Sequence, residues 1–177
     1  GGKLTGYRKM AERIIDKLAK RIDKDSDRDL PDCKTDEISL TGGPFKDADE
    51  VFRYEDKIRT ATTALGLEEF YAVYLVGNYG RQTEEILKVL SSLQYQDVEV
   101  GLALAELEFT INNESVQSVM DFFERSTGRL YFNITSIEKL KKPVLDKMTQ
   151  VFNWSEERLK SEINYLEKGI EIASQFN

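Results

Sequence analysis

The sequence predicts an all-α fold, and three observations support that class. From Ala48 almost to the end of the chain, apolar residues recur at intervals of three or four, the spacing of one face of a helix. No alternating apolar and polar pattern of a length useful for a strand interrupts them. Hydrophobic residues make up 40% and charged residues 32% of the 177 residues, which is typical of a folded, helix-rich protein. We therefore expect a helical, bundle-like domain preceded by one long helix.

The long helix comes first in the chain and is amphipathic. Of the net charge of −7, residues 1–24 contribute +5 and residues 25–177 contribute −12. The basic residues of this helix are expected to face solvent. Its apolar stripe needs a partner, supplied either by the later helices or by structure upstream. The residues of the stripe are Met10, Ala11, Ile14, Ile15, Leu18 and Ile22.

Residues 25–47 lose the helical periodicity and are interpreted as a linker or wrapping loop. The aspartates at the start of this loop are spaced as in a calcium site, but Arg28 stands where such a loop needs glycine. Lys34 stands where it needs a bidentate glutamate, so we expect no calcium site. The later sequence Gly42-Gly43-Pro44 predicts a turn that lays the extended segment against another part of the chain.

Seven helices are expected in the domain formed by residues 48–177. Gly66 and Gly80 suit the C-terminal ends of two of them. Ser155, followed by two glutamates, suits the start of the last one. Pro143 either kinks its helix or moves the start of that helix to about residue 142. The expected bounds are 48–65, 67–79, 82–92, 95–112, 115–125, 134–152 and 155–174.

Composition excludes several chemistries. Histidine is absent, so any imidazole base or histidine metal ligand has to come from elsewhere. The single Cys33 excludes an internal disulfide framework and suits a reducing compartment. A chain this acidic is a poor candidate for binding nucleic acid, and its longest apolar run, 71–76, is too short to cross a bilayer. The acidic surroundings also favour core and rim positions, rather than a platform for stacked bases, for Phe70, Tyr71, Tyr74 and Tyr79.

Three glutamates have a spacing that could gather carboxylates inside a bundle: Glu99, Glu106 and Glu114. Helical bundles that hold two metal ions in this way also use Glu-x-x-His pairs, so we expect no metal site. Arg125 is expected to be structural and to pair with Glu106 or Glu114. The reason is that the helices carrying these residues are joined by a very short turn and should pack antiparallel.

The first ten residues, GGKLTGYRKM, combine two glycines and a lysine with the entrance to a helix. Glycine lets the backbone approach a ligand closely, and the unpaired amides at a helix start attract anions. Glycines at a helix entrance also often serve only the turn, and that interpretation stays open. Since two glycines at a free terminus would be frayed, we expect the chain to be part of a larger protein.

Five short motifs follow one another along the first 133 residues. They are Gly1-Gly2-Lys3-Leu4-Thr5-x-Tyr7-Arg8-x-Met10-Ala11, Leu40-x-Gly42-Gly43, Tyr79-Gly80, Ala105-Glu106-Leu107 and Phe123-Glu124-Arg125-Ser126. Together and in this order they resemble the C-terminal part of the FAD-dependent glycerol-3-phosphate dehydrogenases and oxidases. Departures from the family pattern are Gly6 for threonine, Thr41 for proline, and Glu124-Arg125-Ser126 for Arg-Arg-Thr.

The resemblance implies a parent enzyme that oxidises sn-glycerol 3-phosphate to dihydroxyacetone phosphate with FAD and passes the electrons to quinone or oxygen. It implies that residues 1–24 are the terminal turn and helix of the FAD-binding domain, residues 25–47 a linker, and residues 48–177 the C-terminal helical domain. Lys3 would be the catalytic residue, either stabilising negative charge on the reduced flavin or reaching the substrate phosphate. The cofactor-binding turn would comprise Gly1, Gly2, Lys3, Leu4 and Thr5.

On this interpretation the chain by itself is inactive and binds no FAD. In that family the dinucleotide fingerprint, the substrate arginines and any histidine base lie upstream. We expect the parent to be cytoplasmic, with peripheral association at the inner face of the membrane as an open alternative. Two other classes stay open: a free-standing helical protein-interaction module and a metal-dependent bundle enzyme.

Overall fold

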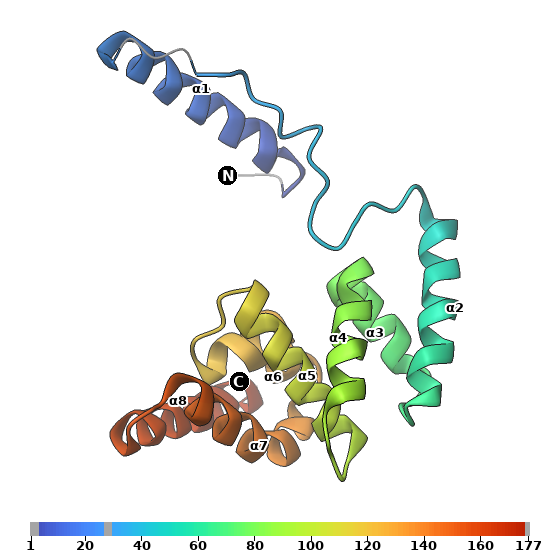
Figure 1. Cartoon of the computed structure of the whole chain (residues 1–177). Helices are drawn as coiled ribbons and strands as arrows, with labels where there is room; N and C mark the ends of the chain where they lie inside the picture. Colours follow the sequence, from blue (N-terminus) through green and yellow to red (C-terminus); the bar gives the residue numbers. More distant parts are fainter. Residues whose placement is uncertain (1–3, 27–29, 176–177) are drawn as a thin grey trace. The chain divides into compact units, whose positions relative to one another are not determined.

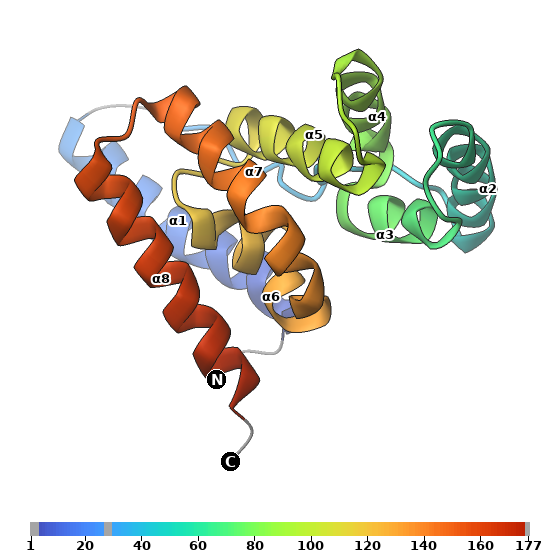
Figure 2. The same ribbon diagram turned by 90° about the horizontal axis from the view of Figure 1, so that it is seen from below.

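The computed structural model describes residues 4–26 and 30–175 (Figure 1, and turned by 90° in Figure 2). Within these ranges it contains helices and no strand, which confirms the all-α prediction. No helix in the same ranges combines the length and the apolar character needed to cross a bilayer. The chain divides into two compact units, Gly1–Leu40 and Thr41–Asn177.

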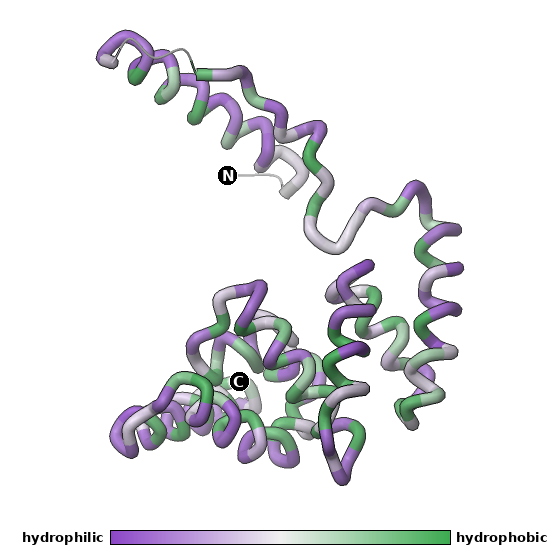
Figure 3. The backbone as a smooth tube through the Cα atoms, in the orientation of Figure 1, coloured by the Kyte–Doolittle hydropathy of each residue, from purple (hydrophilic) through white to green (hydrophobic). Residues whose placement is uncertain are grey.

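The first unit is a helix with an extended segment running back beside it (Figure 1). After a single turn at η1 (Leu4–Gly6), α1 spans Tyr7–Ser26. The hydropathy colouring of Figure 3 shows apolar positions repeating along α1 between polar ones. The predicted apolar stripe is therefore present, and its large side chains are 44–60% exposed within the unit. They are Met10, Ile14, Ile15, Leu18 and Ile22.

The second unit is a helical domain with two hydrophobic cores on either side of α5. Leu102 and Phe109 of α5 enter the core built with α2, α3 and α4, whereas Leu107 enters the core built with α7 and α8. Figure 2 shows α5 between α4 and α7, against both of which it packs. The elements are α2 (Ala48–Ala64), α3 (Phe70–Tyr79), η2 (Gly80–Gln82), α4 (Thr83–Ser92), α5 (Val98–Asn113), η3 (Asp121–Ser126), α6 (Arg129–Phe132), α7 (Ile134–Phe152) and α8 (Glu156–Ser174).

The ends of several helices follow the residues expected from the sequence. Gly66, just past α2, and Gly80, at the end of α3, have φ angles of 86° and 55°, which favour glycine. The side chain of Ser155 accepts a hydrogen bond from the amide of Arg158 and caps α8. Helix α7 begins at Ile134 and continues through Pro143, so the proline does not move its start.

The turn at Gly42 lies against the end of α3, as predicted. The carbonyl oxygen of Gly42 accepts a 2.8 Å hydrogen bond from the amide of Arg81. The Arg81 side chain donates from Nε to the carbonyl oxygen of Pro44, and its guanidinium carbon lies 4.6 Å from the ring centroid of Phe45. A Cβ atom on Gly80 would lie 2.1 Å from the Gly42 oxygen, so this close approach of two backbones requires glycine.

The helix predicted over 115–125 is only partly correct. Ser115 has a φ angle of 58°, and helical turns begin at Val119, whose amide is bound by the buried carboxylate of Glu162 on α8. The turns from Asp121 on are π-helical (η3) rather than α-helical. Although burial acts in the opposite direction, hydrogen bonds from the amide of Gln117 and from Ser118 lower the pKa of the Asp121 carboxyl group.

After η3 the chain turns through Gly128, whose φ angle is 63°, into the four-residue helix α6. This helix was not predicted. Four residues are too few for a recognisable apolar period, and the packing of Leu130 in the second core holds it in place.

Candidate functional site

A buried ion pair lies where the two cores of the helical domain meet. Glu106, in the middle of α5, is fully buried, and Arg129, the first residue of α6, is 5% exposed. The Nη2 atom of Arg129 lies 2.5 Å from Oε2 of Glu106. Because a buried charge is costly unless it is compensated, the pair fixes α6 against α5.

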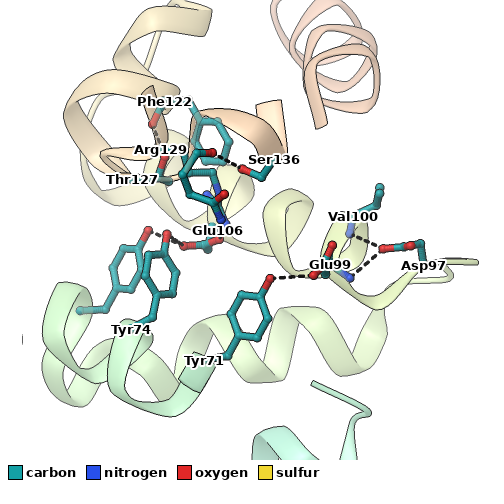
Figure 4. A network of polar contacts seen from close by, with 12 residues as sticks. Tyr71, Tyr74, Asp97, Glu99, Val100, Glu106, Phe122, Thr127, Arg129 and Ser136 are labelled. Atoms are coloured by element: carbon teal, nitrogen blue, oxygen red, sulfur yellow. Dashed lines mark hydrogen bonds and ion pairs between the residues drawn. The ribbon is translucent and has the colours of Figure 1, made fainter. Parts of the chain in front are cut away.

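Two tyrosines of α3 complete the hydrogen bonding of Glu106. The hydroxyl of Tyr74 donates to Oε1 at 2.7 Å, and that of Tyr79 donates to the same oxygen at 3.0 Å. Figure 4 shows Tyr74 extending from α3 toward the carboxylate of Glu106 on α5. Both carboxylate oxygens are therefore satisfied, and the expectation that these aromatic residues occupy the core and its rim is confirmed.

The pKa values of the two tyrosines and of Arg129 are all raised, so these three groups keep their protons near neutral pH. Burial, together with the negative charge of Glu106, raises the pKa of Tyr74 and of Tyr79. Burial by itself would lower the pKa of Arg129, but the Glu106 carboxylate more than offsets it, and the pKa is raised. The tyrosines thus remain donors and the arginine remains a cation, an arrangement suited to holding helices together rather than to proton transfer.

A second polar cluster lies nearer the surface and ties α3, α5 and α7 together. Figure 4 shows its contact between Tyr71 of α3 and Glu99 of α5. The hydroxyl of Tyr71 donates to Glu99 at 3.1 Å, and Nζ of Lys139 lies 2.6 Å from the other oxygen of Glu99. The same Nζ lies 2.7 Å from the carboxylate of Asp97, which caps α5. Burial and then the charge of Glu99 raise the pKa of Tyr71 to about 12.

The three glutamates with suggestive spacing are therefore not gathered into one ligand set. The Glu106 carboxylate is bound by Arg129 and the tyrosines, and the Glu99 carboxylate is bound by Lys139 and Tyr71. Across residues 4–26 and 30–175, no group of three or more His, Cys, Asp or Glu side chains is placed to hold a metal ion.

The prediction for Arg125 is wrong as to its partner. Its side chain is 69% exposed and pairs with Asp121, one turn earlier in η3. The partner of Glu106 is Arg129, four residues further along the chain. One signal in the sequence could have indicated a pairing: Glu106 stands within the predominantly apolar stretch 102–107, where a carboxylate needs a cation. That signal does not say which cation.

The residues proposed to approach a flavin lie in the first unit. Gly1, Gly2 and Lys3 fall outside the described residues, whereas Leu4 and Thr5 belong to η1, the turn that leads directly into α1. The first turn of α1 carries no acidic residue. The assignment of these five residues to a cofactor site therefore stays a prediction.

Known proteins resemble this chain over most or all of its length. The family described as the C-terminal domain of alpha-glycerophosphate oxidase matches residues 33–159. The aerobic glycerol-3-phosphate dehydrogenase of Bacillus subtilis is 33% identical over 160 residues, covering 89% of this chain and 29% of that protein. The enzyme of the same name from Staphylococcus epidermidis is 31% identical over 178 residues, covering 100% of this chain and 32% of that protein.

A solved structure also matches. The X-ray structure of the glycerol-3-phosphate dehydrogenase from Bacillus halodurans complexed with FAD has a TM-score of 0.83 and 32% sequence identity. The match covers 100% of this chain and 36% of that chain. This chain thus spans about a third of the length of the relatives it matches.

Proposed function

Since this chain belongs to the family of the C-terminal domain of alpha-glycerophosphate oxidase, we propose that it is the C-terminal part of an FAD-dependent glycerol-3-phosphate dehydrogenase or oxidase. The parent would oxidise sn-glycerol 3-phosphate to dihydroxyacetone phosphate, reduce FAD, and pass the electrons to quinone or oxygen. The observation that carries the proposal is the structural match of the whole chain, at 32% identity, to a glycerol-3-phosphate dehydrogenase complexed with FAD. We place this parent in the cytoplasm.

The exposed stripe of α1 supports the assignment of residues 1–24 to a flavin-binding domain. Five large apolar side chains on one face are roughly half exposed within their own unit. Covering them with another domain would contribute about 5 kcal/mol, taking about 1 kcal/mol for each half-exposed side chain. Packing of the preceding part of a longer polypeptide on this face would explain why it is apolar.

Lys3 and the amides at the start of α1 would then act on the flavin. FAD supplies the hydride-accepting ring, and negative charge develops on that ring when it is reduced. Free amides at a helix N-terminus carry a partial positive charge, and the first turn of α1 has no acid to oppose it. We favour stabilisation of the flavin anion over contact with the substrate phosphate as the role of Lys3, because the helix terminus already attracts an anion.

The proposal is tested on the intact parent protein. Anaerobic addition of sn-glycerol 3-phosphate should bleach the flavin absorbance of the parent, and glycerol at the same concentration should not. The 177-residue chain alone should elute from gel filtration colourless and show no turnover. A folded parent that contains no flavin, or one whose flavin is not reduced by sn-glycerol 3-phosphate, would overturn the proposal and favour the helical interaction module.

A further inference from the structure

A pocket of about 510 Å³ opens beside the buried network of the helical domain, between α3, α6 and α7. Its walls are mainly apolar and include Phe70, Val73, Phe132 and Leu140. Arg129 also lines the pocket, so a buried guanidinium forms part of a wall that is mainly apolar. The volume lies within the range of small-molecule sites in proteins.

The guanidinium of Arg129 has more donors than the described residues satisfy. It carries five N–H groups, of which Nη2 donates to Glu106. The Nη1 atom is buried and has no hydrogen-bond partner among the described residues. Unpaired buried donors are rare because each one costs free energy. Arg129 also lines the pocket, so an acceptor oxygen bound there lies beside a guanidinium whose hydrogen bonding is incomplete.

The rim of the pocket is unusually apolar for an exposed surface. Phe132 is 90% exposed, and Phe70 and Val73, one turn apart on α3, are about half exposed. Two aromatic rings and a branched side chain at the mouth of a pocket offer stacking and apolar contact to a ring-bearing molecule.

The charges around the pocket disfavour an anionic occupant. The positive charge of Arg129 is already neutralised by Glu106. The other charged residue in the lining is Glu99, whose carboxylate is shared with Lys139, and Asp97 lies beside that lysine. An additional negative charge would meet these carboxylates, whereas a neutral carbonyl would accept from Arg129 without that repulsion.

We propose that this pocket binds a neutral, ring-bearing small molecule through a carbonyl or amide oxygen that accepts from Arg129, with its ring against Phe132 and Phe70. The oxygen adds a partner to a guanidinium whose hydrogen bonding is incomplete, and the ring covers exposed apolar surface. This inference stands apart from the flavin chemistry proposed above, because it uses only residues of the helical domain.

The test is an NMR titration of the full 177-residue chain with three probes of similar size: benzamide, benzoate and toluene. Benzamide should give saturable shifts at the amides of Phe132, Asn133 and Ser136 and at the guanidinium of Arg129. Toluene, which lacks the acceptor, should bind about 2- to 10-fold more weakly, the range expected for one hydrogen bond. Benzoate, which keeps the acceptor but adds a charge, should also bind more weakly than benzamide because the nearby carboxylates repel it.

Two substitutions distinguish binding at this pocket from non-specific binding to apolar surface. Phe132→Ala removes a side chain that is almost fully exposed, so folding is not at risk, and it should weaken benzamide binding about 2- to 10-fold. Phe52→Ala removes an exposed ring on α2, outside the pocket, and should leave binding unchanged. Equal affinity for toluene and benzamide, an unaffected Phe132→Ala variant, or shifts outside the pocket would overturn the proposal.

Discussion

Neutralising Glu106 should destabilise the helical domain far more than the size of the change suggests. Glu106→Gln preserves shape but removes the charge that compensates buried Arg129, and it turns an amide donor toward an arginine donor or a tyrosine hydroxyl. Leaving one partner of a buried ion pair without its counter-charge costs about 3–5 kcal/mol. Glu106 is fully buried, so solvent cannot replace the lost charge.

That free energy corresponds to a large shift in melting temperature. For a chain of this length, 1 kcal/mol lowers the melting temperature by about 2–4 °C, so Glu106→Gln should lower it by about 6–20 °C. The measurement is thermal and urea denaturation followed by far-UV circular dichroism. Glu108→Gln is the matched control on the same helix. Glu108 is partly exposed, and its Oε2 atom lies 3.5 Å from Nζ of Lys147. A surface pair of this kind contributes at most about 1 kcal/mol.

A double variant tests the reasoning itself. If the destabilisation arises from the uncompensated charge of Arg129, a variant that also removes this charge should be more stable than Glu106→Gln. The double variant Glu106→Gln/Arg129→Met should therefore recover part of the stability lost in the single variant. The reasoning is refuted if Glu106→Gln melts no lower than Glu108→Gln, or if the double variant is less stable than Glu106→Gln alone.

Three further predictions concern the other features described. Gly80→Ala should lower the melting temperature more than Gly66→Ala, because both have positive φ but only at Gly80 does a Cβ collide with the Gly42 oxygen; equal losses in a thermal scan would contradict this. Asp121→Asn should cost about 1 kcal/mol at neutral pH, because an amide oxygen accepts from the backbone amides of Gln117 and Ser118 more weakly than a carboxylate does. Since the folded pKa of Asp121 is lowered, its contribution is present above the ordinary carboxyl pKa and lost as the pH falls through the lowered one, so urea midpoints of wild type and variant should converge in acid. Lys3→Ala in the parent should slow turnover about 30- to 1000-fold. A lower kcat with a lower flavin potential supports the flavin role, a higher KM supports the phosphate role, and unchanged values remove Lys3 from the site.

The helical architecture could be predicted from the sequence because its determinants are local. Apolar residues three and four positions apart define the buried face of each long helix, and Gly66, Gly80 and Ser155 mark helix ends through their own backbone and side-chain chemistry. The motif order along residues 1–133 was also enough to identify the family, which the match to residues 33–159 confirms.

The polar network could not be predicted, because it depends on contacts between residues far apart in the sequence. Glu106 is bound by tyrosines 32 and 27 residues before it and by an arginine 23 residues after it. The choice of Arg129 over Arg125 follows from the π-helical turns of η3 and the left-handed turn at Gly128, which together change the direction of the chain between the two arginines. Glu162 of α8 binds the amide of Val119 just before those turns, so the segment that presents Arg129 is anchored by a helix that only the tertiary structure brings there.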